Sequence, residues 1–399
     1  MANIAEIFSQ KNVISYLQQR VYPNMLGDTL FPSRKVPNFN VEILENTRST
    51  PVIAPVSTFD VEAEIGSREA NVTAAELGYI KRKMQLKEED IMALRSPRNA
   101  EEETYLIQNV YNDIDNLVRG IKARVELMRM QLLAQGVVYP DDENVNWKVD
   151  YKLPKEHQLT VSKSWDKDGD PIADIQNWIS GLDTIPTRAL TSNKVVAALL
   201  KNGTIADYFK RLGLIPSPTA LNQLFQGMGL PTIVTYDQKY RFQGTNGQMT
   251  VKRYFPEDKF IMFDDATTGE TLYGPTPEES RILAGNAQLQ NIGNIVAMVY
   301  ETNLDPISTW TKAAATALPT LASRDTLFQA KVLLDDTNSN NSNNNSTSPQ
   351  TKSATPDNLN NMTVQDIKAL LDKNGVTYDP NDKKDDLINK ATAAGLANV

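Results

Sequence analysis

The sequence predicts an α+β fold: a large body of helices and strands, then a small helical unit on a polar linker. Three observations lead to this prediction. Apolar residues recur three and four positions apart between residues 97 and 135, with strand-like alternation before and after them. Residues 181–310 alternate helix-like with strand-like pieces, a pattern typical of a compact α+β domain. Asparagine, serine and threonine dominate residues 335–361, which have too few apolar side chains to form a core.

Composition excludes several functional classes. Cysteine is absent, so disulfides and thiolate metal sites are excluded. A Ser-His-Asp triad could use only the single histidine, His157. We interpret His157 instead as a partly exposed residue in a strand-rich segment, without a catalytic role. The net charge of −8 argues against a protein that holds nucleic acid through clustered Lys and Arg. With no phosphate-binding loop or nucleophile–base pattern, we expect no enzyme, cofactor or metal site.

The first 80 residues predict extended structure. Residues 1–35 contain two prolines and a glycine and few apolar residues, so we expect an arm that lies on another surface. No signal peptide and no apolar run of 18 residues occurs, so we expect no membrane segment. Residues 36–80 predict a long hairpin. Its clearest strand has an apolar face and a charged face, formed by Phe59, Val61, Ala63 and Ile65 and by Asp60, Glu62 and Glu64. An isolated two-stranded hairpin is marginal in water, so the apolar face needs a neighbour.

The longest helix is predicted over residues 97–135. Ser96 is the expected N-cap, Pro97 the first helical residue and Gly136 the C-terminal stop. At 1.5 Å per residue this helix is roughly 58 Å long. A coiled-coil stalk is the alternative, but a single helix flanked by strands favours a structural spine.

The second half predicts a compact mixture of elements. Residues 144–165 are strand-like, and Asp170 and Pro171 begin a helix. The acidic residues there do not fit a calcium loop, because the sixth position counted from Asp166 is Pro171 instead of glycine. We expect helices within 192–202 and 219–228 and strands within 232–242, 248–255, 258–265 and 325–334, with a hairpin turn at 245–247.

Three blocks carry a resemblance to a known family. They are "PTRALTSNKVVAALLKN", "DKFIMFDDATTGETLYGPTPEE" and "ETNLDPISTWTKAAATALPTLASRDTLFQAKVL". With the order of elements, they resemble the major capsid proteins of tailed bacteriophages, in the lambda-type branch (capsid protein E family), over about residues 1–334. The resemblance implies the tailed-phage capsid fold, also called HK-ninety-seven-like. Its parts would be an N-terminal arm (1–35), an extended loop (36–80), a peripheral domain (81–180) with the spine helix (97–135), and an axial domain with return strands (181–334).

The resemblance also implies a function. Such a subunit forms hexamers and pentamers that tile an icosahedral shell around double-stranded DNA, without specific binding to it, in a virion assembled in the host cytoplasm. Expected partners are other copies of the chain, a scaffolding protein, a portal and a decoration protein, and no catalytic residue transfers. Candidate contacts between subunits are Arg48, Phe59, Val61, Glu62, Glu64 and Arg68. Here Arg48 or Arg68 would pair with Glu62 or Glu64 of a neighbour; the alternative is single exposed charges of little energetic value.

Residues 362–399 resemble small helix–extension–helix (HeH) units of the LEM and SAP-like type. Thr363 is the expected first cap, Gly375 the stop, and the inward residues are Val364, Ile367, Leu370, Leu371, Leu387 and Ile388. Five Lys and six Asp give the unit no basic excess, so DNA binding is not favoured. The linker over 335–361 has an r.m.s. reach of about 28 Å. We expect it to display an adhesion or decoration module on the shell.

Two alternatives remain from the sequence. One is an encapsulin-like shell of a cellular nanocompartment, which has the same fold. The other is a DNA-associated oligomeric protein that acts through the C-terminal unit.

Overall fold

The computed structural model divides the chain into two compact units, Met1–Asp335 and Asp336–Val399. In the first unit, the structure describes residues 8–46, 70–86, 88–140, 147–244, 246–264, 268–285, 293–302, 308–322 and 324–334. In the second unit, it describes residues 364, 367–368, 371, 376, 379 and 382–393.

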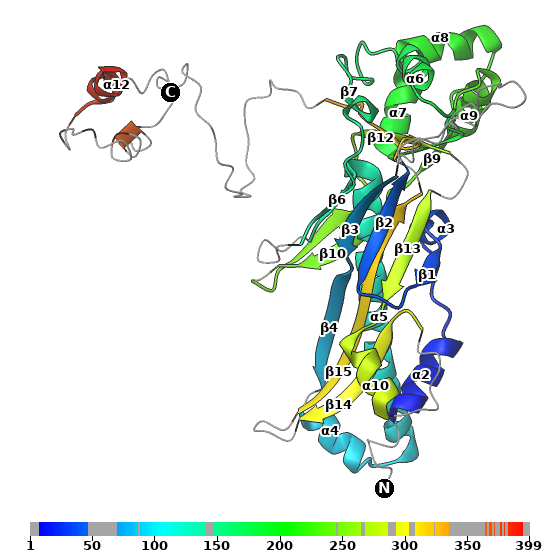
Figure 1. The fold of residues 1–399 in the computed structure, drawn as a ribbon, viewed down its shortest axis with the longest axis vertical. Helices are drawn as coiled ribbons and strands as arrows, with labels where there is room; N and C mark the ends of the chain where they lie inside the picture. The colour runs from blue at the N-terminus through cyan, green and yellow to red at the C-terminus, as the bar shows by residue number, and fades with distance from the viewer. Residues whose placement is uncertain are drawn as a thin grey trace, which may run out of the picture. The chain divides into compact units, whose positions relative to one another are not determined.

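The predicted α+β fold is confirmed by the elements of the first unit (Figure 1). The helices are α2 (Gln10–Gln19), α3 (Leu26–Leu30), α4 (Glu88–Arg95), α5 (Ala100–Gln135), α6 (Pro171–Ser180), α7 (Asn193–Lys201), α8 (Gly203–Leu212), α9 (Pro218–Gly227), α10 (Pro277–Gly285) and the 3-10 turn η1 (Lys155–His157). The strands are β1 (Ser33–Lys35), β2 (Asn40–Asn46), β3 (Ala70–Glu76), β4 (Gly78–Leu86), β5 (Val137–Val138), β6 (Val149–Asp150), β7 (Gln158–Thr160), β8 (Arg188–Thr191), β9 (Thr232–Thr235), β10 (Lys239–Gln243), β11 (Met249–Arg253), β12 (Lys259–Phe263), β13 (Gly269–Gly274), β14 (Val296–Thr302), β15 (Ser308–Leu321) and β16 (Phe328–Lys331).

The spine helix α5 begins three residues later than predicted. Asn99, not Ser96, is its N-cap, and the Asn99 side chain accepts a hydrogen bond from the Glu102 N–H at 2.7 Å. The Glu102 carboxylate accepts one from the Arg98 N–H at 2.7 Å, so two backbone donors are satisfied together. The predicted stop is confirmed: Gly136 has φ 70° and its N–H donates to the Leu132 carbonyl.

The first sheet lies against α5. Its central strand is β15, which pairs with β4 on one side and with β13 and β14 on the other, while β1 extends the sheet beyond β13. Figure 1 shows α5 running along this sheet. Buried apolar residues of α5, including Ile114, Leu117 and Ile121, share a core with alanines of β14 and β15. The small alanine side chains let the helix approach the strands closely.

The second sheet carries helices α6 to α9. Its strand order is β7-β16-β12-β8-β9. Its core contains Trp165, Phe225 and Phe260, whose side chains are all fully buried. Asp170 caps α6 and Pro171 is its first residue, as predicted. Of the predicted strand-like stretch 144–165, the structure describes residues 147–165, which contain the short strands β6 and β7. His157 lies in η1, because Pro154 starts a turn there.

The boundary between the parts of the chain that form the two sheets is not at residue 180, where the peripheral domain was expected to meet the axial domain. Residues 158–180 pack with the second sheet, because Trp165 and Ile172 belong to its core. Strands β13 to β15, expected in the axial part, form the sheet beneath α5.

The described part of the N-terminal arm lies on its own chain, which differs from the expected extended arm. Val13 and Ile14 of α2 are buried, at 0% and 4% exposure. Val13 packs against α5 residues and Ile14 against Val296 of β14. The sequence did not predict that the arm packs on its own chain, because only two apolar residues of a polar helix make the contact. Two are enough here, since α5 and β14 already form an apolar surface for them.

In the second unit the structure describes helix α12 (Lys384–Ala393). Ile367, Leu371 and Leu387 are fully buried together, with Val376 and Ile388 packed against them. Val364, predicted to face inward, is 38% exposed, so that prediction is wrong. Thr363, Leu370 and Gly375 lie outside the described residues, so the helix–extension–helix arrangement stays a prediction.

Candidate assembly surfaces

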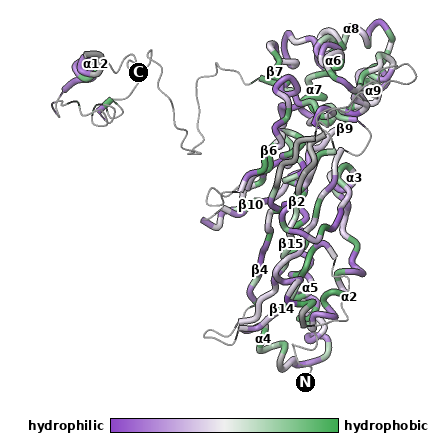
Figure 2. The backbone as a smooth tube through the Cα atoms, viewed as in Figure 1, coloured by the Kyte–Doolittle hydropathy of each residue, from purple (hydrophilic) through white to green (hydrophobic). Residues whose placement is uncertain are grey.

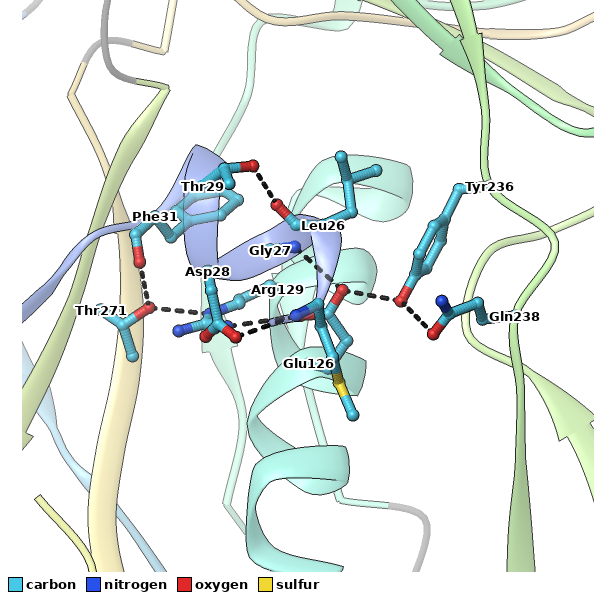
Figure 3. A network of polar contacts seen from close by, with 11 residues as sticks. Leu26, Gly27, Asp28, Thr29, Phe31, Glu126, Arg129, Tyr236, Gln238 and Thr271 are labelled. Atoms are coloured by element: carbon cyan, nitrogen blue, oxygen red, sulfur yellow. Dashed lines mark hydrogen bonds and ion pairs between the residues drawn. The ribbon is translucent and has the colours of Figure 1, made fainter. Parts of the chain in front are cut away.

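A buried polar network fixes the N-terminal segment to the spine helix (Figure 3). The Glu126 carboxylate, 0% exposed, accepts hydrogen bonds from the Gly27 N–H at 3.0 Å and the Tyr236 hydroxyl at 2.8 Å. The Arg129 guanidinium donates to Asp28 at 2.7 Å and to the Thr271 hydroxyl at 2.9 Å. Four separate parts of the chain therefore meet at one turn of α5.

The electrostatics of this network keep its charges paired. Burial raises the pKa of Asp28, but hydrogen bonds from the Met25 N–H and from Arg129 outweigh burial and hold the pKa below its usual value. Burial, together with the charge of Glu126, raises the pKa of Tyr236, so this hydroxyl remains a donor. A buried charge is tolerated only when it is paired and hydrogen-bonded, as here.

A second polar anchor lies about three turns earlier on α5. Asp115 is 3% exposed and accepts hydrogen bonds from the hydroxyls of Tyr16 at 3.0 Å and Tyr22 at 2.9 Å. Arg20 pairs with the same carboxylate at 2.9 Å. The sequence contained a signal for this anchor, because Asp115 directly follows Ile114 on the apolar face of the predicted helix.

The base of the predicted extended loop is present. Strands β2 and β3 pair antiparallel, with Asn40 opposite Glu76 and Asn46 opposite Ala70. The structure therefore brings the two ends of segment 47–69 together. The six predicted contact residues, Arg48, Phe59, Val61, Glu62, Glu64 and Arg68, lie outside the described residues.

A cleft of about 1010 Å³ lies between α5, β4 and the β10–β11 hairpin. Its cationic lining consists of Lys81, Arg82, Arg119, Arg124, Lys239 and Arg241, and Glu76 is the carboxylate among the lining residues described. Figure 2 shows β4 and the end of the hairpin as hydrophilic. In a chain of net charge −8, this is a local excess of positive charge.

Within the described residues, no group of three or more acidic or histidine side chains is placed to hold a metal ion. Among the helices described, none is long and apolar enough to cross a membrane.

Comparison with known proteins gives a family. The model of the family phage major capsid protein E matches residues 9–332. A search of curated proteins found no match. The fold is similar to that of a prophage protein of E. coli CFT073 described as a capsid protein, with a TM-score of 0.54 and 18% identity, covering 81% of this chain and 98% of that one. A phage-related protein of Bordetella bronchiseptica RB50 gives a TM-score of 0.47 and 14% identity, covering 80% and 95%.

The family match covers most of the first unit and agrees with the predicted tailed-phage capsid fold, which is confirmed. The family match does not favour the two alternatives from the sequence, an encapsulin-like nanocompartment shell and a DNA-associated oligomeric protein. It points to a structural role, to self-assembly into a shell and to a place in the virion. The chain belongs to the phage major capsid protein E family and is a shell-forming capsid subunit.

Proposed function

We propose that copies of this chain assemble as hexamers and pentamers into an icosahedral phage head that encloses double-stranded DNA. The observation that carries the proposal is the family match over residues 9–332, which spans both sheets and the spine helix. A shell of this kind shares stability among its subunits, because each interface buries surface that a single copy leaves exposed.

Contacts between subunits involve the segment between β2 and β3. Phe59 and Val61 belong to its apolar face and Glu62 and Glu64 to its charged face, while Arg48 and Arg68 lie near its ends. An alternating strand covers a neighbour with one face and sets the register with the other. We propose these six residues as contact residues.

The shell subunit acts without catalysis or cofactor. Its partners are a scaffolding protein during assembly in the host cytoplasm, a portal at one vertex and a decoration protein on the shell. The packaged DNA touches the inner wall without specific recognition. An acidic chain suits this role, because a wall that does not attract phosphate leaves the genome free to move during filling.

The second unit is a module displayed on the outer surface by its polar linker. Many weak contacts add through multivalency when every subunit carries one copy. Protease treatment of intact particles tests this display. Release of the 336–399 fragment from unbroken shells is expected, whereas survival of the fragment until the shell is opened places it inside.

Expression of the full chain, alone and with a co-expressed scaffolding protein, tests the assembly proposal. We expect closed particles of uniform diameter with hexameric and pentameric units in electron micrographs. Material that stays monomeric at high concentration under both conditions contradicts it.

A further inference from the structure

The cleft between α5, β4 and the β10–β11 hairpin gathers positive charge from three elements. Arg82 of β4, Arg119 of α5, and Lys239 and Arg241 of β10 line the cleft and are exposed. In the described part of the chain, none of these four residues forms an ion pair with a carboxylate. Cations without counter-charges repel one another, so an anion that enters the cleft would stabilise the arrangement.

Two contacts place the Arg82 guanidinium between the spine helix and the hairpin. Its Nη2 donates to the Gln243 side chain at 3.2 Å, and its Nη1 lies 3.9 Å from the Cβ position at Gly120. Arg119 directly precedes Gly120 on α5, and Arg241 lies two positions before Gln243 on the same face of β10. Three guanidinium groups from three elements therefore belong to the same part of the cleft.

Two simpler explanations do not account for the whole cluster. Lysines on an edge strand protect a sheet from aggregation, and β4, which carries Lys81 and Lys83, pairs only with β15 among the described strands. That explanation does not extend to the arginines of the helix and the hairpin. Ordinary solvated surfaces mix charges of both signs, whereas Glu76 is the carboxylate among the described residues that line the cleft.

Aromatic rings lie among these cations. Trp147, Tyr240 and Phe242 line the cleft and are half-buried. The Trp147 indole N–H donates to the Glu76 carbonyl at 3.1 Å, which holds this ring beside β3. The Lys252 ammonium lies 4.7 Å from the centre of the Phe242 ring and adds a cation next to it. Rings that are held in place and partly uncovered offer flat apolar faces to a ligand.

Cations and rings in one cleft are the combination that binds a single strand of nucleic acid. The cations pair with successive phosphates and unpaired bases stack on the rings, with little dependence on sequence. Arginine suits this task, because its planar guanidinium binds phosphate through two nitrogens. A duplex keeps its bases stacked on one another, so it could use the cations but not the rings. The volume of about 1010 Å³ suits a chain of linked groups better than one small ion.

An acidic peptide is the competing polyanion. Its carboxylates could pair with the arginines, but the rings would be covered only if apolar side chains alternated with the acidic ones. Every nucleotide carries both a phosphate and a flat base, so any sequence of nucleotides matches the cleft. The single strand is therefore the better match.

We infer that this cleft binds single-stranded nucleic acid without sequence preference, with Arg82, Arg119 and Arg241 at the phosphates and bases stacked on Trp147 and Phe242. This inference goes beyond the shell function, because it concerns unpaired nucleotides and the separate subunit. The net charge of −8 does not oppose it, since a sum over the whole chain conceals a local cluster. Binding weakens as the salt concentration rises, because each neutralised phosphate releases counterions.

Binding of labelled oligonucleotides to the purified, unassembled full-length chain tests the inference. The probes are an oligothymidylate, an oligouridylate and a DNA duplex of equal length, and fluorescence anisotropy is measured over a series of salt concentrations. We expect both single strands to bind at least about fivefold more tightly than the duplex, because only they present bases for stacking. No binding of either single strand, or equal or tighter binding of the duplex, overturns the inference.

Removal of two arginines tests the phosphate contacts. Arg119→Gln with Arg241→Gln should weaken oligothymidylate binding at least about tenfold and reduce the slope of log affinity against log salt by about 1 to 2. Arg98→Gln with Arg211→Gln is the control of equal charge, since both residues are exposed and neither lines the cleft. An equal loss of affinity in the two double variants indicates attraction by overall charge and overturns the inference.

Two changes at the rings test the stacking. Phe242→Leu should weaken binding of the single strands at least about fivefold with an unchanged salt slope, whereas Met249→Ala, exposed on the same hairpin and not in the lining, should bind as the wild type does. Oligothymidylate should also quench tryptophan fluorescence in the wild type, and Trp147→Phe should abolish the quenching while binding is retained. Absence of quenching in the wild type, together with full affinity of Phe242→Leu, overturns the inference.

Poly-L-glutamate tests the competing occupant in the same assay. We expect it to displace bound oligothymidylate only at a higher concentration of charged groups than unlabelled oligothymidylate requires, because it has no rings to stack. Displacement at a lower concentration, lost in the Arg119→Gln, Arg241→Gln variant, would assign the cleft to an acidic peptide and overturn the inference.

Discussion

The Arg129 guanidinium donates to the Asp28 carboxylate at 2.7 Å, joining the spine helix to a residue 101 positions earlier in the chain. The Arg129 side chain is 3% exposed and also lies 3.3 Å from the fully buried Glu126. This arrangement makes the N-terminal segment part of the folded body of the subunit.

Removal of the Arg129 side chain should strongly destabilise the fold. Arg129→Ala leaves Glu126 buried without its cation, which costs about 3 to 5 kcal/mol of unfolding free energy. Arg119→Ala on the same helix removes an exposed guanidinium and should change stability by no more than about 0.5 kcal/mol. Chemical denaturation of the unassembled proteins measures both. Equal stability of the two variants contradicts the proposed role of the network.

Loss of the Asp115 carboxylate should loosen residues 10–22 specifically. Asp115→Ala leaves the hydroxyls of Tyr16 and Tyr22 without their acceptor, so local opening becomes easier. We expect hydrogen exchange in α2 to accelerate about tenfold, while exchange in α7 stays unchanged. Asn112→Ala, an exposed change on the same helix, is the control. Uniform acceleration in both helices would indicate general destabilisation instead.

The left-handed residue that ends the spine helix should not tolerate a side chain. Gly136 has φ 70°, and a Cβ there would lie 2.5 Å from the Leu153 side chain. Gly136→Ala should lower the unfolding free energy by about 1 to 3 kcal/mol. Gly203, at the first position of α8, has open space around it, so Gly203→Ala should leave stability unchanged or slightly raised. Thermal unfolding compares the two, and a smaller loss at Gly136 than at Gly203 contradicts this explanation.

Stability should fall in alkaline solution. Burial raises the pKa of Tyr254 to about 12, and burial with Glu126 raises that of Tyr236 further. Both hydroxyls are protonated in the folded state at pH values where unfolded tyrosines, with a pKa of 10.0, ionise. The contribution of these two hydroxyls to the unfolding free energy is therefore complete below pH 10. It is lost as the pH rises through their pKa values in the folded state.

Tyrosine absorbance during a pH titration checks this result. Tyr236 and Tyr254 should ionise only above pH 10, together with unfolding. Tyr236→Phe should reduce the pH dependence above pH 10. A titration in which every tyrosine ionises near pH 10 without loss of structure is the contrary outcome.

The local elements were predictable because their signals are local. The periodic residues from Ile107 to Leu132 predicted the spine helix, and Asp170 with Pro171 predicted the start of α6. The start of α5 was misplaced because Ser96 and Asn99 are both good caps, and only the hydrogen bonds of Glu102 distinguish them.

The network of Glu126 and Arg129 was not predictable, because its partners are distant in sequence. Glu126 and Arg129 have the spacing of an ordinary solvated pair on a helix surface. Their burial depends on Tyr236 and Thr271, more than 100 residues later. The same reason hid the basic cleft, whose cations come from α5, β4 and β10.

Electron microscopy of the purified full-length protein, with and without a co-expressed scaffolding protein, tests the central claim most directly. We predict closed shells of one diameter, with pentameric vertices and hexameric faces built from this chain. A population that contains only separate monomers across the whole concentration range, in both preparations, would contradict assembly into an icosahedral head.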